Sequence, residues 1–164
     1  MKSMTVLVDT REHDGKNQHI LKYFDSKDIP WRKTKLDYGD YTFEIPKNEA
    51  LNIPRTLSFA SDIIVERKAS LNELTDNLIK DRARLQKEFT LAPKTKVLLI
   101  ENNGFADLVN GRYISKYDPK AFTATLFTFW HEYNLPVFFV PKPDYSGLFI
   151  YYYFQYYFRG LLKS

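Results

Sequence analysis

The chain contains no cysteine, and only 6 of its 164 residues are glycine and 2 are methionine. The absence of cysteine excludes structural disulfides, cysteine-ligated zinc, iron–sulfur clusters and thiol nucleophiles. Long apolar runs are lacking too, because the longest, near the C-terminus, is interrupted by Gln155 and Arg159. That run is too short and too rich in tyrosine to span a bilayer. We therefore expect neither a thiol enzyme nor a membrane protein.

The chain also lacks a strong excess of charge of one sign. Its 24 Lys and Arg residues exceed its 20 Asp and Glu residues by 4, which permits a nucleic-acid partner without arguing for one. The N-terminus has no apolar stretch of signal-peptide length. The length suits one domain over residues 1–164, without repeats or linkers. We expect a soluble, cytoplasmic protein that uses no small-molecule cofactor.

Apolar runs at regular intervals predict an alternation of strands and helices. Buried strands are expected at residues 5–8, 42–45, 63–65, 97–100 and 137–140, with a weaker strand over 31–37. Helices are expected around residues 20–24 and over 71–89, from 119 onward and over 144–162. Residues 46–61 are polar and contain two prolines, which indicates a long hairpin connection. This order favours an α/β fold with a mostly parallel sheet covered on both faces.

Three helix starts carry recognisable capping residues. Ser70 with Glu73 three residues later forms a capping box. Asp118 before Pro119 is typical of an N-cap followed by the first helical position. Asp144 is the cap that we expect for the last helix.

One acidic–any–lysine motif stands out from the four that the chain contains. Only Glu66-Arg67-Lys68 directly follows a buried apolar strand, and alternation along the strand puts Glu66 and Lys68 on the same face. Two ionisable groups at the end of a core strand are costly unless each has a partner. A metal ion is one such partner, and an ordinary ion pair between the two side chains is the other.

A second carboxylate, Asp40, fits the same site. It precedes the strand that we expect to pair with residues 63–68 through the long hairpin. Mg²⁺ takes carboxylate and backbone oxygens and keeps several waters. Asp40, Glu66 and the backbone carbonyl of Arg67 would supply such a shell, with Lys68 orienting or helping to deprotonate the attacking water. In the competing interpretation, Asp40 only shapes a turn.

The end of the first predicted strand adds further candidates. Asp9, with Glu12 close behind, completes an acidic cluster if that strand is central, and Arg11 is then a phosphate contact. His13 is kept as a candidate because it follows Glu12.

Five blocks of the sequence resemble, in the same order, successive blocks of the XPF-type nuclease domain of the restriction-endonuclease-like PD-(D/E)xK superfamily. They are residues 6–12, 36–41, 64–68, 83–85 and 97–101, and the resemblance covers most of the chain. The most specific part is Gly39-Asp40 followed by Glu66-Arg67-Lys68. This combination is far more informative than the acidic–any–lysine pattern alone.

The resemblance implies a restriction-endonuclease-like central mixed sheet flanked by helices on both faces. It also implies a stand-alone nuclease domain, as in phage and bacterial versions, that cuts branched or flapped DNA with Mg²⁺ or Mn²⁺ as a homodimer. Carried over by position, Asp40 and Glu66 match metal ligands, Lys68 the catalytic lysine, and Arg84 a basic position on the helix beside the cleft. The predicted catalytic residues are Asp9, Asp40, Glu66 and Lys68, and the predicted supporting residues are Arg11, Glu12, Arg67 and Asn72. The predicted metal ligands are Asp40, Glu66, the Arg67 carbonyl and, with a central first strand, Asp9. Arg82, Arg84 and Lys87 are the predicted DNA contacts, with a solvated helix face as the alternative.

The sequence departs from the family pattern in two places. The family has an acid four residues after its lysine, where this chain has Asn72, which accepts a hydrogen bond but brings no negative charge. Glu73 is the neighbouring acid that would compensate. The sequence also lacks the tandem helix-hairpin-helix module that many members use to grip DNA. These departures keep open a second interpretation, a non-catalytic DNA-binding or scaffolding subunit of the same fold.

Aromatic residues are the one abundant class, with 13 Phe, 12 Tyr and 2 Trp, and 9 of them lie between Tyr145 and Phe158. A helix over this segment is hydrophobic around nearly its whole circumference, so it must be buried on more than one side. Tyrosine suits an interface because the ring is buried while the hydroxyl reaches water. We expect this helix and the one from Pro119 to form a homodimer interface, in preference to stacking on unpaired bases. The interface residues predicted on the last helix are Phe149, Tyr152, Tyr153, Tyr156 and Tyr157.

Overall fold

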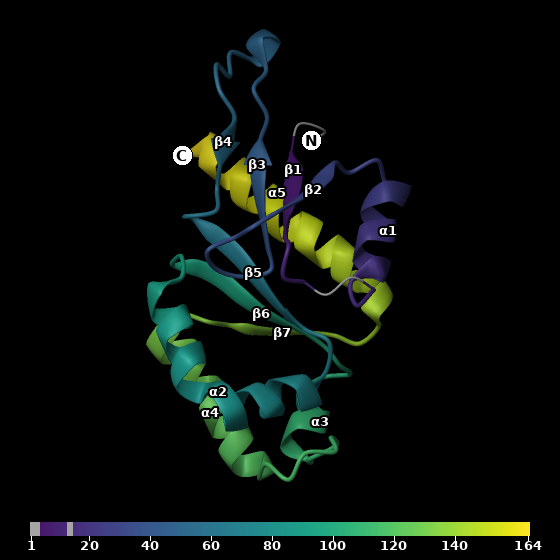
Figure 1. The fold of residues 1–164 in the computed structure, drawn as a ribbon, viewed down its shortest axis with the longest axis vertical. Coiled ribbons are helices and arrows are strands. Elements are labelled where there is room, and N and C mark those ends of the chain that lie inside the picture. Colours follow the sequence, from purple (N-terminus) through teal and green to yellow (C-terminus); the bar gives the residue numbers. More distant parts are fainter. Residues whose placement is uncertain (1–3, 13–14) are drawn as a thin grey trace.

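The computed structural model describes residues 4–12 and 15–164, so the candidate His13 lies outside the described residues. A mixed sheet runs through the molecule, with helices packed on both of its faces (Figure 1). The elements in chain order are β1 (Thr5–Asp9), α1 (Gln18–Ser26), β2 (Trp31–Thr34), β3 (Tyr41–Ile45), the 3₁₀ turn η1 (Glu49–Leu51), β4 (Leu57–Ser58), β5 (Ile63–Lys68), α2 (Leu71–Leu91), β6 (Thr95–Glu101), α3 (Phe105–Val109), α4 (Pro119–Tyr133), β7 (Val137–Val140), the 3₁₀ turn η2 (Pro143–Tyr145) and α5 (Ser146–Lys163).

The strand order is β2-β1-β3-β5-β6-β7, with the short β4 added on β3. Strands β1 and β2 are parallel, as are β5, β6 and β7, whereas β3 is antiparallel to β1, β4 and β5. The sheet is therefore mixed, as the resemblance implies, and less parallel than the strand–helix alternation suggested. The reason is that the hairpin between β3 and β5 reverses the chain direction at the centre of the sheet.

Alternating residues along the central strands supply two separate cores. Val65, Val97 and Leu99 face a core closed by α1 and α5. Leu98 and Ile100 face a second core closed by α2 and α4. Since successive side chains of a strand point to opposite faces, this alternation sends Arg67 toward α1, and Glu66 and Lys68 toward α2.

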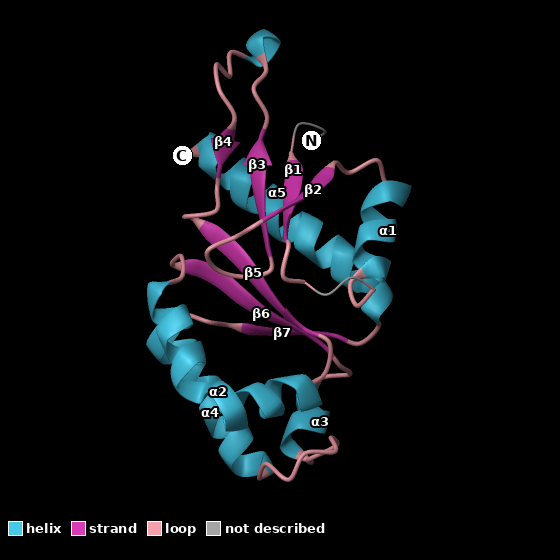
Figure 2. Ribbon diagram, in the orientation of Figure 1, coloured by secondary structure: helices cyan, strands magenta, loops and turns pink. Residues whose placement is uncertain are grey.

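The hairpin connection over residues 46–62 extends beyond the rest of the sheet (Figure 2). The sequence indicated an irregular connection, whereas the structure places η1 and β4 in it. An Asn48 side chain accepts a hydrogen bond from the Leu51 backbone and caps η1. Neither η1 nor β4 was predicted, because a strand of two residues and a single 3₁₀ turn have no periodic apolar pattern.

Two of the three expected helix caps are confirmed. Ser70 Oγ accepts a hydrogen bond from the Glu73 backbone at 3.1 Å, although the Glu73 carboxylate accepts from Ala69, one residue before the cap. Asp118 Oδ2 accepts from the Ala121 backbone at 3.0 Å. The prediction for Asp144 was wrong, because η2 precedes α5 and no side chain caps that helix.

Helix α5 uses part of its aromatic surface within the chain. Phe154 is buried in the core beneath α1 and α5, and Phe149, Tyr153 and Tyr157 are partly buried against it. Two tyrosines on the same helix stay exposed, Tyr152 to 47% and Tyr156 to 58%. Across residues 4–12 and 15–164, no helix combines the length and apolar character that a membrane crossing requires.

Candidate active site

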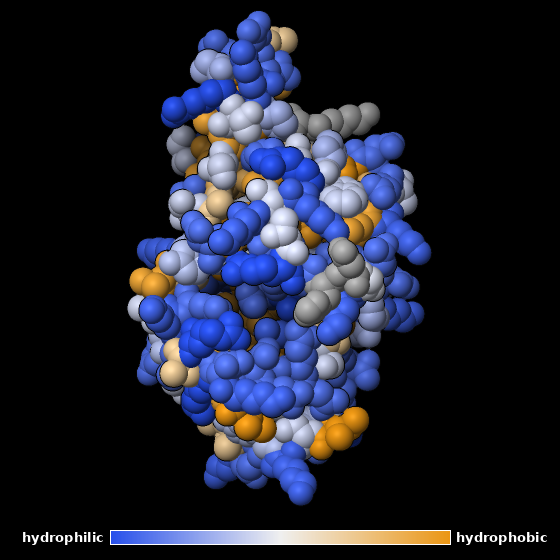
Figure 3. All heavy atoms as spheres, viewed as in Figure 1, coloured by the Kyte–Doolittle hydropathy of each residue, from blue (hydrophilic) through white to orange (hydrophobic). Residues whose placement is uncertain are grey.

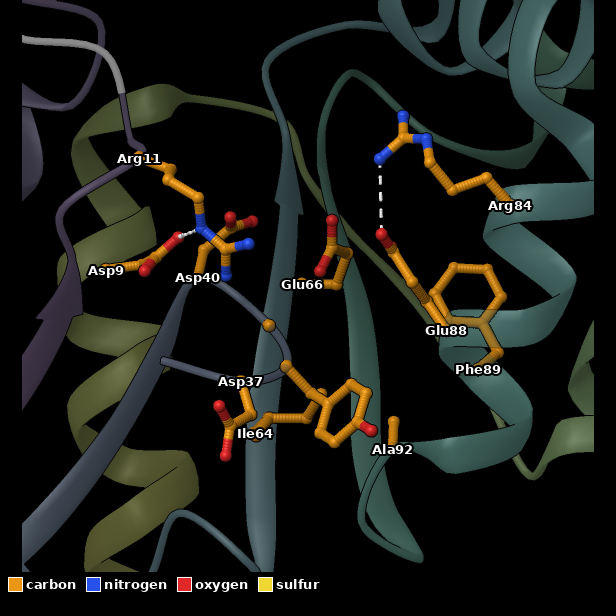
Figure 4. Close-up of a pocket in the computed structure, with 12 residues that line it drawn as sticks. Asp9, Arg11, Asp37, Asp40, Ile64, Glu66, Arg84, Glu88, Phe89 and Ala92 are labelled. Carbon is orange, nitrogen blue, oxygen red and sulfur yellow. Dashed lines mark hydrogen bonds and ion pairs between the residues drawn. The ribbon is translucent and has the colours of Figure 1, made fainter. Parts of the chain in front are cut away.

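A pocket of about 190 Å³ opens where β1, the turn before β3, β5 and the second half of α2 meet. The face shown in Figure 3 is mainly hydrophilic and is hollowed at this level of the sheet. Asp9, Asp40 and Glu66 contribute carboxylates to the pocket wall, while Arg11 and Arg84 lie on opposite sides of it (Figure 4). The structure therefore brings together residues that are up to 75 positions apart in the sequence.

Asp40 is positioned by the backbone around it. Gly39 has a φ of +74°, and a Cβ on this residue would lie 2.8 Å from Ile64 Cβ, so only glycine fits this turn without a shift. The Asp40 backbone donates to the Val65 carbonyl at 2.9 Å. Its Oδ2 accepts from the Arg67 backbone N–H at 2.7 Å. One carboxylate oxygen is thus fixed by β5.

Glu66 and Lys68 lie on the same face of β5, as alternation predicted. Lys68 Nζ is 3.6 Å from Glu66 Oε1, and both side chains are mostly buried. Lys68 also donates to Asn77 Oδ1 at 2.8 Å. Asn77, from α2, was not predicted from the sequence. The pattern that could have indicated it is a polar residue three positions after Leu74, one of the buried leucines of α2.

The two central carboxyl groups are electrostatically strained. Burial and the nearby Glu66 charge raise the pKa of Asp40 well above its usual value, against the Arg67 backbone hydrogen bond. Burial also raises the pKa of Glu66, although Lys68 opposes this effect. Such a pair favours either a bound proton or a bound cation, because desolvation and like charge both disfavour the doubly ionised state.

The donor set fits a hard divalent cation. Two carboxylates at one wall of a polar pocket are the oxygen ligands that Mg²⁺ and Mn²⁺ accept. Within the described residues, no group of three or more His, Cys, Asp or Glu side chains is arranged to hold a metal ion. An ion here would accordingly rest on Asp40, Glu66, backbone oxygen and water, a combination that suits Mg²⁺ because it keeps several waters.

Asp9 is buried and both of its carboxylate oxygens accept hydrogen bonds. Oδ1 accepts from the Leu36 backbone at 2.9 Å, and Oδ2 accepts from Arg11 Nε at 2.8 Å. Arg11 also donates to the Leu36 carbonyl. Asp9 thereby holds the Arg11 side chain, which is 58% exposed, at the edge of the pocket, and its predicted catalytic role stays a prediction.

Arg67 lies on the opposite face of β5 from Glu66. Its guanidinium is 2.6 Å from Glu101 Oε1 and 3.5 Å from Glu12 Oε1. Tyr41 donates its hydroxyl hydrogen bond to Glu12 Oε2 at 2.5 Å. Glu12 therefore belongs to a buried ionic cluster on the face of the sheet toward α1 and α5, and it does not line the pocket.

Glu101 joins that cluster to two helices. Its Oε2 is 2.6 Å from His19 Nε2 of α1 and accepts a hydrogen bond from Ser146 Oγ of α5 at 2.5 Å. The sequence contained only a weak indication of this role, an acid at the end of a buried strand. Its partners come from distant segments, which periodicity does not reveal.

The basic residues of α2 diverge in their placement. Arg84 lines the pocket and pairs with Glu88 at 3.1 Å and Asp81 at 3.2 Å. Arg82 instead donates to Tyr117 and Thr125 and lies 5.9 Å over the Phe129 ring, so it packs toward α4. Lys87 is exposed and does not line the pocket.

Asn72 lies on the first turn of α2 and contacts the segment before α4. Its Oδ1 accepts from the Ile114 backbone at 2.7 Å. Glu73, the acid that would compensate for it, is engaged with Ala69 at the helix start. Neither side chain lines the pocket.

Comparison with known proteins identifies a family and a shared fold. Residues 8–153 match the family model described as the ERCC4 domain. The fold is similar to XPF from Aeropyrum pernix, with a TM-score of 0.67 and 20% sequence identity over 97% of this chain and 67% of that chain. It is also similar to XPF from Aeropyrum pernix in complex with DNA, with a TM-score of 0.66 and 18% identity over 95% of this chain and 66% of that one.

This chain spans about two thirds of the length of those structures. No curated protein gave a match. The family match covers most of the sequence, including every residue of the pocket. The resemblance to the XPF-type nuclease domain is therefore confirmed, and the chain belongs to the ERCC4 domain family of DNA nucleases.

Proposed function

We propose that this chain is a Mg²⁺- or Mn²⁺-dependent endonuclease that hydrolyses phosphodiester bonds in DNA. The observation that carries the proposal is the pair of partly buried carboxylates, Asp40 and Glu66, in one polar pocket, with the Lys68 ammonium 3.6 Å from Glu66. Family membership and the fold shared with an XPF structure in complex with DNA support DNA as the substrate.

Asp40 and Glu66 are the side chains that would hold the ion, together with the Arg67 carbonyl. When bound, the ion supplies Lewis-acid stabilisation of negative charge on the scissile phosphate. Lys68 contributes a second positive charge, which its hydrogen bond to Asn77 holds near Glu66. Its role is to orient the attacking water and to offset charge that develops in the transition state.

Arg11 and Arg84 are the phosphate contacts at the pocket rim. Their guanidinium groups are 58% and 59% exposed and line opposite sides of the carboxylates. Arginine suits this role because its planar group donates two hydrogen bonds at once to phosphate oxygens. Cleavage then leaves 5′-phosphate and 3′-hydroxyl ends, following the usual course of this fold.

A cleavage assay on purified protein tests the proposal. The substrates are plain duplex, flap, fork and four-way junction DNA, each with Mg²⁺, Mn²⁺ or EDTA. We expect metal-dependent nicking, stronger on branched DNA, and its loss in the Glu66→Gln variant. Undiminished cleavage by Glu66→Gln would contradict the assignment of the site.

The alternative is a non-catalytic DNA-binding or scaffolding subunit of the same fold. It is favoured by Asn72, which lies outside the pocket, and by the absence of a three-residue metal cluster among the described residues. It predicts no heat of Mg²⁺ binding in calorimetry and no nicking of any substrate. Measured binding of Mg²⁺ that disappears in Asp40→Asn supports the enzyme instead.

We further propose that two copies pair through α4, β7 and α5. Strand β7 is the last strand of the sheet, and its Phe138 is 50% exposed while contacting Phe149 of α5 at a ring distance of 4.5 Å. On α4, Phe127 and Trp130 stack and remain 44% and 38% exposed. An exposed aromatic surface on an edge strand and its flanking helices is typical of a subunit interface.

Sedimentation equilibrium distinguishes the two oligomeric states. We expect a dimer for the unmodified chain and a monomer for Phe138→Lys, which places a charge at the centre of this surface. A matched control, Leu51→Lys, changes an exposed residue of the hairpin connection and leaves the dimer intact. A monomeric mass for the unmodified chain at micromolar concentration would overturn the proposed interface.

A further inference from the structure

A second cavity, of about 400 Å³, adjoins the candidate active site. It lies between the C-terminal ends of α2 and α4 and shares Phe89 and Ala92 with the active-site pocket. Its lining includes three basic side chains, those of Lys94, Lys96 and His131.

Lys96 is the unusual member of this group. It is only 5% exposed, and its ammonium donates to a single carbonyl, that of Pro93, at 3.0 Å. No carboxylate among the described residues forms an ion pair with it, and burial lowers its pKa. Because an ammonium has three donors, two remain for another acceptor. A buried cation without an anionic partner is costly, and an anion in the cavity would offset that cost.

The sheet register places Lys96 beside the active site. Lys96 pairs with Ile64 across β5 and β6, and Ile64 itself lines the active-site pocket. Glu66 lies two residues after Ile64 on β5, which is about 6.6 Å along the strand, and β6 lies about 4.8 Å to the side. Together these distances place the Cα atoms of Lys96 and Glu66 about 8 Å apart. Their side chains share one face of the sheet, which is the face covered by α2.

We propose that this cavity is a subsite that binds a backbone phosphate of the DNA strand next to the scissile bond. The inference rests on the proposed nuclease function. The contact would hold the substrate strand to one side of the scissile bond. A separation of about 8 Å corresponds to about two nucleotides along a strand, given a rise of about 3.4 Å each. Lys96 therefore binds a phosphate about two nucleotides from the cut, and the exposed Lys94 and His131 line the same cavity.

One acid, Glu132, also lines the cavity, and it is exposed on α4. Its charge opposes an anion, so its removal should strengthen binding. The two substitutions Lys96→Met and Glu132→Gln therefore change affinity in opposite directions. A purely structural lysine would not show the losses of affinity and of salt dependence that Lys96→Met should cause.

Fluorescence anisotropy with a labelled flap DNA tests the subsite over a series of salt concentrations without added metal. All variants carry Glu66→Gln, so that the DNA stays intact. We expect Lys96→Met to weaken binding about tenfold, as loss of one charge-assisted hydrogen bond does. The salt dependence, the slope of log affinity against log salt, should fall by about 1. Glu132→Gln should bind about twofold tighter.

Lys22→Met is the matched control, because Lys22 is an exposed lysine of α1 on the opposite face of the sheet. Methionine is close in length to lysine and removes a buried charge, so Lys96→Met should fold; a thermal melt checks this. In the active protein, Lys96→Met should raise KM more than it lowers kcat.

The outcomes separate the two proposals. If the unmodified protein cuts DNA and Lys96→Met matches Lys22→Met in affinity, salt slope and KM, the subsite is refuted and the nuclease function stands. If the unmodified protein binds but does not cut DNA, the nuclease function fails, while the affinity and salt slope still decide the subsite. Absence of any DNA binding refutes the subsite as well.

Discussion

Glu66 and Arg67 are neighbours on β5, yet their side chains lie in opposite electrostatic surroundings. Glu66 faces a pocket with Asp40, where burial and like charge raise the pKa of both carboxyl groups. Arg67 faces the other side of the sheet, where Glu101 and Glu12 neutralise it within a buried cluster. On the face toward α1, every carboxylate oxygen of Glu12 and Glu101 already has a hydrogen-bond or ion-pair partner, so that cluster is closed to a further ligand.

The difference separates a binding site from a structural support. The proposed cation site lies on the face toward α2, whereas the carboxylate oxygens of the opposite cluster already have partners within the protein. The two faces are joined through the Arg67 backbone, whose N–H holds Asp40 while its side chain holds Glu101. Substitutions on the two faces should therefore affect different properties, activity on one and stability on the other.

The largest expected effect is on cleavage. Glu66→Gln and Asp40→Asn should each lower the cleavage rate at least about a thousandfold, because each removes a charge that holds the ion. The free energy of unfolding should be unchanged or higher, since a strained buried charge is lost. Single-turnover kinetics and urea unfolding measure the two quantities. Glu88→Gln, which alters the rim, is the control and should retain most activity.

On the opposite face, Arg67→Met should destabilise the fold by about 3–5 kcal/mol, because it leaves buried carboxylates without their partner. Arg84→Met, which removes an exposed pair, should change the free energy of unfolding by less than about 1 kcal/mol. Urea unfolding compares the two. Equal stability of these variants would show that the cluster of Arg67, Glu101 and Glu12 does not stabilise the fold.

Lys68 provides an intermediate effect that sharpens the comparison. Lys68→Met should lower the cleavage rate about a hundredfold through loss of one transition-state charge. Asn77→Ala should cause a smaller loss, about tenfold, because the ammonium keeps its charge but loses the hydrogen bond that orients it. If the asparagine variant is as impaired as the lysine variant, Asn77 acts in some way other than orientation.

The smallest effect concerns the departure from the family pattern. Asn72→Asp restores the family acid, but residue 72 is bound to the Ile114 backbone and lies outside the pocket. Calorimetry should therefore show less than about a twofold change in Mg²⁺ affinity. A tenfold gain would mean that the first turn of α2 rearranges to reach the ion.

The sequence predicted those parts of the site that depend on local pattern. Period-two alternation places Glu66 and Lys68 together, and the family motif leads to Asp40. The caps at Ser70 and Asp118 follow from local hydrogen bonding, so they too were predictable.

Residues whose partners are distant in the chain were beyond the sequence. Asn77 and Glu101 acquire their roles only when α2 and β6 pack beside β5. Arg82 and Arg84 are two positions apart on the same helix, so the helical period turns their side chains about 200° from each other. The pattern does not say which of them packs on α4 and which lines the pocket. The helix is also kinked at Asp81, directly before Arg82, where the φ of −135° departs from helical geometry.

The contact between Gly39 and Ile64 has a consequence for how the sequence can change. A Cβ at residue 39 would meet Ile64 Cβ at 2.8 Å, so the turn that presents Asp40 and the strand that presents Glu66 are fitted to each other. The two motifs should therefore be exchanged together, although positions 39 and 64 are 25 residues apart in the sequence. A chimera that takes only one of them from a distant relative should misplace the carboxylates, whereas one that takes both should retain their spacing.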